Sequence, residues 1–248
     1  MKFAVFMNRE YHRWYSDRLG REMELLVFGH AGRAVLFFPP RMGRFYDYEN
    51  WGVIDALTDR INAGELQLFC VDSIDNESFY CEWAHPDGRI NRHLQYEQYI
   101  LCEVLPLMRA KGPDNDFEAA GCSMGAYHAA NIAFKYPHLF NKLVCMSGRY
   151  DLTRPVRFFR DLLDGYRNEN IYFNMPRQFM TNIQSGWALD HIRRLDVLLA
   201  VGETDPFKDD NYEFSELLGW KGLQHKFYTW SGYAHNPRAW KKMVQLYL

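Results

Sequence analysis

The pentapeptide Gly121-Cys122-Ser123-Met124-Gly125 constrains the fold more than any other part of the chain. It follows a short apolar run, residues 117–120, that predicts a buried strand, and it precedes a helical pattern that Pro137 ends. Gly-x-Ser-x-Gly between a strand and a helix is typical of a nucleophile elbow, a sharp turn that lifts the serine hydroxyl above the sheet. The turn strains the backbone and leaves no room for flanking side chains, which favours glycine there.

The predicted helix after this turn supports a catalytic serine. Its alanines recur at helical spacing and form a face small enough to lie close on a sheet: Ala126, Ala129, Ala130 and Ala133. Because the bare pattern arises by chance, the alternative is a glycine-rich turn whose serine has no role. The strand before the pattern and the helix after it favour catalysis by Ser123.

The rest of the chain predicts a mainly parallel sheet. Residues 9–16 and 21–29 alternate and are joined by a turn, which predicts an antiparallel hairpin. Six further strands are predicted at 34–38, 66–71, 117–120, 142–147, 195–201 and 225–230, with helices at 51–62, 90–111, after the elbow, at 211–220 and at 237–248, and with a loop at 72–89. We therefore expect the α/β-hydrolase order: eight strands, helices on both faces, and the serine after the fifth strand.

The predicted domain is the whole chain, residues 1–248. Between Tyr150 and His191 the pattern breaks into arginines, aromatics and Pro176. We interpret this stretch, about 152–191, as an insertion of short helices over the top of the sheet and not as a separate domain.

In this fold order the acid and the base of a catalytic triad follow the serine along the chain. The strand 195–201 is followed by Asp205, and the last strand is followed by His235. A serine hydroxyl needs a base to take its proton, and the base needs a carboxylate to hold its tautomer. Ser123, Asp205 and His235 are therefore the candidate triad.

Other roles for these residues remain open. Asp205 could cap a helix or form an Asp-Pro turn, with Glu203, Asp209 and Asp210 as fallback acids, and His235 could be an ordinary loop histidine. Two further histidines are weaker candidates: His225 starts the last strand, at the wrong end of the sheet, and His128 lies on the elbow helix, facing away from the serine.

Acyl transfer also needs hydrogen-bond donors for the oxyanion. The backbone N–H of Met124 directly follows the serine. The loop after the strand 34–38 should supply the second donor, and since Pro39 and Pro40 have no N–H, the candidates are Arg41 and then Met42. Cys122 precedes the apex and should point into the fold. The arginines 154, 157 and 160 are interpreted as a solvated helix face.

Composition limits the partners and the location. The net charge is −2 and no basic cluster is present, which argues against nucleic acid. No apolar run is long enough to cross a membrane, and the first residues lack a signal-peptide pattern. The five cysteines suit free thiols in a reducing compartment, so we expect a cytoplasmic protein. Aromatic residues reach 17%, and a few of them should line a pocket.

With these residues in view, the chain resembles the putative-esterase family of α/β-hydrolases, which includes esterase D, feruloyl esterases and mycolyl transferases. The resemblance rests on GCSMGAYHA, SGRYDL at 147–152, VGETDPF at 201–207, GYAHNPRAW at 232–240 and the strand order. It implies ester chemistry on Ser123, Asp205 and His235 without a metal or cofactor. The chain departs from the family at Pro39-Pro40, before the oxyanion donor, and at Asn236.

The predicted function is a serine carboxylesterase that cleaves a small or medium acyl ester through an acyl-enzyme. An acyltransferase would use the same triad with an alcohol in place of water, and only product analysis would separate the two. The third alternative is a non-catalytic binding protein on the hydrolase fold, which the three intact triad residues argue against. The acyl chain, the leaving group and the oligomeric state cannot be predicted from the sequence.

Overall fold

The computed structural model describes residues 7–112 and 116–248. Its centre is one sheet of eight strands in the order β1-β2-β4-β3-β5-β6-β7-β8. The strands are β1 (Arg9–Ser16), β2 (Arg21–Phe28), β3 (Arg33–Phe38), β4 (Leu66–Val71), β5 (Phe117–Cys122), β6 (Phe140–Met146), β7 (Asp196–Gly202) and β8 (His225–Trp230). The hairpin β1–β2 is antiparallel and β2 pairs antiparallel with β4, whereas β4, β3 and β5 to β8 run parallel. The predicted α/β-hydrolase sheet is confirmed.

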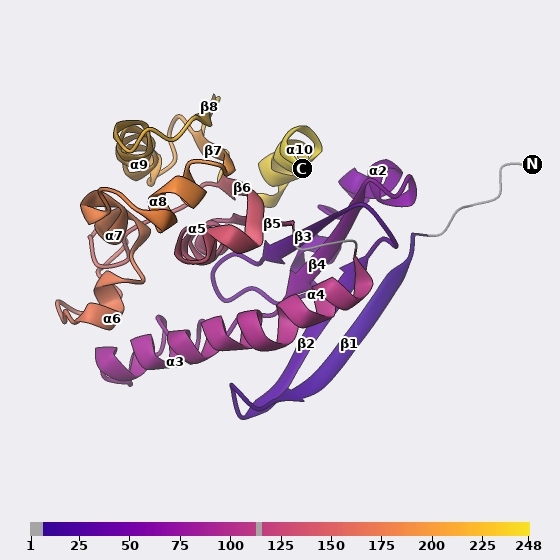
Figure 1. Ribbon diagram of the computed structural model, residues 1–248, viewed down its shortest axis with the longest axis horizontal. Helices are drawn as coiled ribbons and strands as arrows, with labels where there is room; N and C mark the ends of the chain where they lie inside the picture. The colour runs from indigo at the N-terminus through magenta and orange to yellow at the C-terminus, as the bar shows by residue number, and fades with distance from the viewer. Residues whose placement is uncertain (1–6, 113–115) are drawn as a thin grey trace, which may run out of the picture.

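Helices cover both faces of the sheet (Figure 1). One face carries α3 (Pro86–Tyr99), α4 (Leu105–Lys111), α5 (Met124–Lys135) and α9 (Lys208–Trp220). The other carries α2 (Thr58–Asn62) and α10 (Pro237–Tyr247). Because alternate residues of a strand point to opposite faces, neighbours such as Leu36 and Phe37 on β3 enter different cores.

Two predicted helices differ in the structure. The predicted helix 90–111 begins earlier, at Pro86, because proline fits the first turn of a helix. A short π-helical segment at Ile100–Val104 interrupts the α-helix, since Pro106 has no N–H to donate to the carbonyl four residues earlier. The predicted helix 51–62 is shorter in the structure: only a 3-10 turn (Asp55–Leu57) and α2 lie within it. Before it, α1 (Asp47–Asn50) forms a separate short helix, and Gly52 at φ 66° lies between α1 and the 3-10 turn.

Two predictions fall partly on residues outside the described ranges. The absence of a signal peptide rests in part on residues 1–6, and the predicted end of the long helix includes Pro113. The described part of that helix ends at Lys111.

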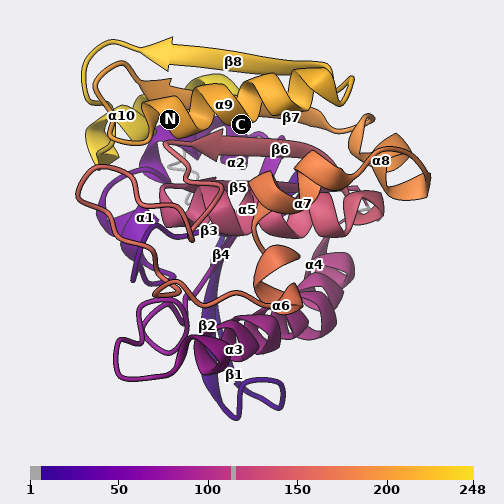
Figure 2. The same ribbon diagram turned by 90° about the vertical axis from the view of Figure 1, so that its left-hand side faces the viewer.

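The insertion lies between β6 and β7. Its helices are α6 (Glu169–Tyr172), α7 (Pro176–Asn182) and α8 (Trp187–Ile192). The contacts of α7 are with α5 and α9, so this helix packs beside the sheet's helical layer and not over the top of the sheet. The part that reaches the top is the helix-free segment of residues 148–168, which runs past the carboxyl ends of the strands in Figure 2.

The turn between β5 and α5 has the backbone of a nucleophile elbow. Ser123 has φ 56° and ψ −118°, a conformation that L-residues rarely adopt. A Cβ on Gly121 would lie 2.3 Å from the carbonyl of Gly125, and a Cβ on Gly125 would lie 2.2 Å from the carbonyl oxygen of Phe38. Both positions therefore require glycine. Behind them, the alanine face of α5 is fully buried against the sheet, as predicted.

The contact between Gly125 and β3 predicts a clear stability difference. Gly125→Ala should lower the free energy of unfolding by about 1–3 kcal/mol, because the new methyl group overpacks the Phe38 carbonyl. Gly219→Ala is the matched control: it lies in α9 with open space around its Cβ position, so it should cause no loss. Urea unfolding of both variants measures the difference, and equal stability would refute the tight contact.

Candidate active site

An Asp–His pair lies at the carboxyl ends of β7 and β8. The ring Nδ1 of His235 lies 2.9 Å from Oδ2 of Asp205. The second carboxylate oxygen of Asp205 accepts the backbone N–H of Phe207 at 2.9 Å, and Asp205 is fully buried. With Nδ1 held by the carboxylate, Nε2 of His235 is the ring atom left for proton transfer.

Ser123 and His235 line the same cavity, which has a volume of about 220 Å³. Aromatic and aliphatic side chains form most of its wall, together with two arginines. The lining residues are Arg41, Tyr80, Ser123, Met124, Arg149, Leu152, Phe159, Phe207, Tyr233 and His235. The structure thus brings together residues that lie more than a hundred positions apart in the sequence.

The fallback acids have other surroundings. Asp210 is buried, accepts the N–H of Tyr150 at 2.7 Å and pairs with Arg177. Burial raises the pKa of this carboxyl group. Glu203 and Asp209 are exposed to solvent. None of the three carboxylates forms an ion pair with His235 in the described ranges, whereas Asp205 does.

The other histidines contact different partners. His225 lies at the start of β8 and its ring contacts Ser215 Oγ at 2.7 Å. His128 is buried on α5, with Nε2 3.1 Å from Oδ1 of Asp75. Neither histidine lines the cavity of Ser123.

The loop after β3 turns sharply at Arg41. The N–H of Gly43 donates to the carbonyl of Pro40 at 2.8 Å, and Met42 has φ 58°, which together describe a type II turn. The N–H of Met42 donates to Oδ2 of Asp75 at 2.8 Å. No hydrogen bond of the described residues uses the N–H of Arg41. Of the two predicted donors on this loop, Arg41 is therefore the one available to a ligand.

Asp75 links this turn to the elbow helix. One carboxylate oxygen holds the turn at Met42, and the other lies beside His128 on α5. Asp75 and His128 are both buried, so the contacts are shielded from water. Asp75 carries no signal in the sequence, because it lies in the stretch 72–89 predicted as a loop, with no motif around it.

The three arginines interpreted as a solvated face are exposed, as predicted, but they lie on a loop and not on a helix. Arg154 pairs with Glu213, and Arg160 pairs with Glu82 at 2.8 Å. Arg149 lies in the stretch SGRYDL, from which no role for it could be predicted, and it lines the cavity of Ser123.

None of the five cysteines lines the cavity of Ser123. All five are free, and four are buried while Cys102 is exposed. Burial raises the pKa of the Cys122 thiol far above its ordinary value, so this thiol stays protonated. Its side chain is fully buried in the fold, as predicted.

In the described ranges, no group of three or more His, Cys, Asp or Glu side chains could hold a metal ion. Within the same ranges, every helix is too short or too polar to cross a membrane.

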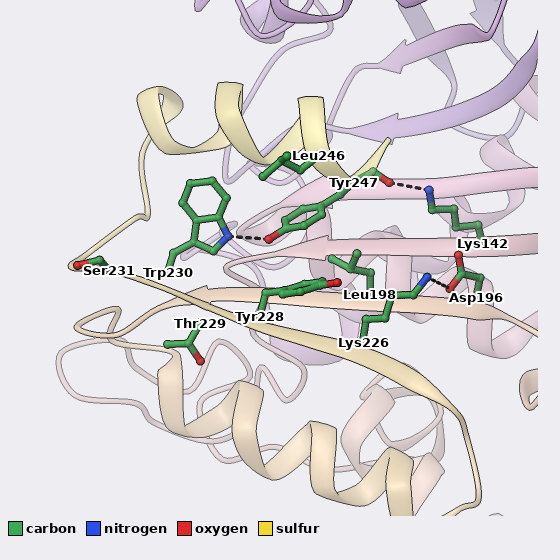
Figure 3. A pocket seen from close by; sticks show the side chains of 10 residues that line it. All are labelled: Lys142, Asp196, Leu198, Lys226, Tyr228, Thr229, Trp230, Ser231, Leu246 and Tyr247. Carbon is green, nitrogen blue, oxygen red and sulfur yellow. Dashed lines mark hydrogen bonds and ion pairs between the residues drawn. The ribbon is translucent and has the colours of Figure 1, made fainter.

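A larger cavity, of about 650 Å³, lies apart from Ser123 between α10 and strands β6 to β8 (Figure 3). Both of its lysines are already paired. Lys142 donates to the carbonyl of Tyr247 at 2.6 Å, and Lys226 pairs with Asp196 at 3.0 Å. This cavity holds neither the elbow serine nor the Asp–His pair, so the smaller cavity is the candidate active site.

Comparisons with known proteins agree with this fold. A ferulic acid esterase structure superposes with a TM-score of 0.76 at 15% identity, covering 97% of this chain and 96% of the other. An S-formylglutathione hydrolase from Agrobacterium tumefaciens gives a TM-score of 0.73 at 15% identity over 97% and 95% of the two chains. A fluorophosphonate-binding serine hydrolase from Staphylococcus aureus gives 0.67 at 15% identity over 97% and 96%. Among curated proteins, no sequence match is found.

The sequence itself matches a family model. The model described as "Putative esterase" covers residues 47–235, which include the elbow, Asp205 and His235. This match extends over most of the chain, and the chain therefore belongs to the Putative esterase family of ester hydrolases.

Proposed function

We propose that the protein is a carboxylesterase in which Ser123, His235 and Asp205 form the catalytic triad. The observation that carries this proposal is that the elbow serine lines one small cavity together with His235, whose Nδ1 lies against Asp205. The cavity volume is below the usual range for ligand sites, which favours a small acyl ester as substrate.

The proposed reaction proceeds through an acyl-enzyme. Ser123 Oγ attacks the ester carbonyl carbon while Nε2 of His235 takes the hydroxyl proton. The negative charge on the carbonyl oxygen is held by the backbone N–H groups of Met124, at the start of α5, and of Arg41. The tetrahedral intermediate expels the alcohol, which takes the proton from His235. Water then attacks the acyl group by the same steps and releases the acid.

Asp205 keeps His235 in the tautomer that this mechanism needs. Its buried carboxylate holds Nδ1–H and stabilises the imidazolium that forms in each step. Asp75 is a positioning residue in this proposal: by holding the N–H of Met42, it sets the turn so that the N–H of Arg41 remains free.

Replacement of the serine tests the nucleophile. Ser123→Ala should abolish hydrolysis of a short p-nitrophenyl ester and labelling by a fluorophosphonate, because the attacking oxygen is gone. Circular dichroism should match the wild type. A folded alanine variant that keeps a substantial part of the wild-type rate would overturn the assignment.

Replacement of the acid tests the triad. Asp205→Asn should lower kcat by about 10⁴, because an amide cannot hold the correct histidine tautomer. Asp209→Asn, at an exposed neighbouring carboxylate, is the matched control and should leave kcat near the wild-type value. The reverse order of effects would mean that the acid is misassigned.

The two variants Arg41→Pro and Arg41→Ala separate the backbone N–H from the side chain. Both lose the guanidinium, but only proline loses the N–H. Position 41 is the second residue of a turn, where proline is favoured, so the backbone should be preserved. On a neutral ester, kcat of the proline variant should be about a hundredfold below that of the alanine variant. Equal kcat values in two folded variants would place the second oxyanion donor elsewhere.

A further inference from the structure

Arg149 is a buried cation that has no carboxylate partner among the residues the structure describes. It follows β6 and has a relative exposure of 4%. Its Nη2 donates to three backbone carbonyls, those of Leu152, Arg154 and Arg160, at 3.2, 2.8 and 2.8 Å. Its Nε is buried and makes no hydrogen bond among the described residues, and no ion pair there includes Arg149. Burial lowers the pKa of this guanidinium.

Arg89 is a second buried arginine, and its contacts can be compared with those of Arg149. It is the other arginine that is nearly fully buried in the described ranges, with an exposure of 3%. Like Arg149 it donates to three backbone carbonyls, but it also pairs with Asp164 at 2.8 Å. A buried charge is costly unless an opposite charge compensates it. Arg149 forms no such ion pair within residues 7–112 and 116–248.

The carboxylates that lie near Arg149 are already engaged. Asp151 accepts from Thr153 and Gln178, and Asp210 accepts from Tyr150 and pairs with Arg177. Asp161 accepts the N–H of Leu163 and pairs with Arg167. These three carboxylates thus accept hydrogen bonds from other donors. In the described residues, none of them forms a hydrogen bond or an ion pair with Arg149.

A second cation and a phenol lie beside Arg149 in the same cavity. The guanidinium carbon of Arg41 lies 5.7 Å from the ring centre of Tyr80. Burial raises the pKa of Tyr80 to about 12, while both arginines act on its hydroxyl in the opposite direction. Tyr80 therefore stays a neutral hydrogen-bond donor near two cations. No ion pair in the described part of the chain uses the side chain of Arg41.

We propose that Arg149, Arg41 and Tyr80 form a subsite for a carboxylate, so that the substrate is a small ester bearing one. The proposal rests on the proposed function, because it takes the ester carbonyl to lie at Ser123. The three groups line the cavity of Ser123, and a guanidinium binds a carboxylate through charge-assisted hydrogen bonds. The carboxylate can belong to the acyl part or to the alcohol part of the ester.

Matched pairs of esters test this subsite. Monoethyl glutarate and ethyl 4-carbamoylbutyrate carry a carboxylate or a neutral amide on the acyl side, and carboxymethyl butyrate and carbamoylmethyl butyrate do so on the alcohol side. In one pair at least, kcat/KM of the wild type should be about tenfold or more higher for the carboxylate. The ester pair that shows this preference for the carboxylate identifies whether the carboxylate belongs to the acyl part or to the alcohol part of the substrate. Equal values within both pairs would overturn the proposal.

Variants test which residues cause the preference for the carboxylate ester. Arg149→Met should remove most of this preference. Arg149→Lys should keep part of it, because lysine retains the positive charge. Since Arg149 also holds the segment 149–160, Arg41→Met is the second test, and it should reduce the preference without touching those carbonyls. Arg157→Met, an exposed arginine on the same loop, should leave it unchanged. A preference that survives in both Arg149→Met and Arg41→Met would refute the assignment.

Binding without turnover separates this proposal from the esterase mechanism. Calorimetry should show glutarate binding to the wild type about tenfold or more tightly than to Arg149→Met, and more tightly than glutaramide. Failure of all four esters to react would count against the proposed function alone. Absence of glutarate binding would count against the subsite, whatever the turnover.

Discussion

The close packing of the elbow against the end of β3 is the contact on which the site depends. A glycine at position 125 lets α5 approach the carbonyls of Phe38 and Pro39, and these residues lead directly into the turn at Arg41. The same contact therefore fixes the serine and sets how far the Arg41 turn lies from it. Strain at Ser123 is tolerated because the packed helix and the strands on either side hold the turn.

Two buried carboxylates then orient the groups around the serine. One carboxylate oxygen of Asp205 contacts the ring of His235, and the other accepts the N–H of Phe207. Asp75 likewise contacts the ring of His128 with one oxygen and accepts the N–H of Met42 with the other. Each carboxylate fixes one neighbouring group and is itself fixed by a second one. In a site shielded from water, such prearranged dipoles need little reorganisation during a reaction, which is how an oxyanion is stabilised most effectively.

The arginines of residues 149–160 differ in their surroundings according to how deeply each is buried. Arg154 and Arg160 form ion pairs at the surface, where such pairs contribute little to stability. Arg149 comes from the same segment, but its guanidinium is buried at the cavity of Ser123 and forms no ion pair with a carboxylate in the described part of the chain. The same residue type is thus a solvated surface group at two positions and a candidate recognition group at the third.

The elbow, the strand order and the positions after β7 and β8 could be predicted from the sequence, because each depends on local periodicity or on its place along the chain. The break in the long helix and the roles of Asp75, Tyr80 and Arg149 could not. Asp75 and Tyr80 lie in an irregular stretch without a motif, and Arg149 differs from its neighbouring arginines only in what packs around it. Burial and partners far apart in the sequence are properties of the tertiary structure, so only the folded chain decides which charges are compensated and which are left for a ligand.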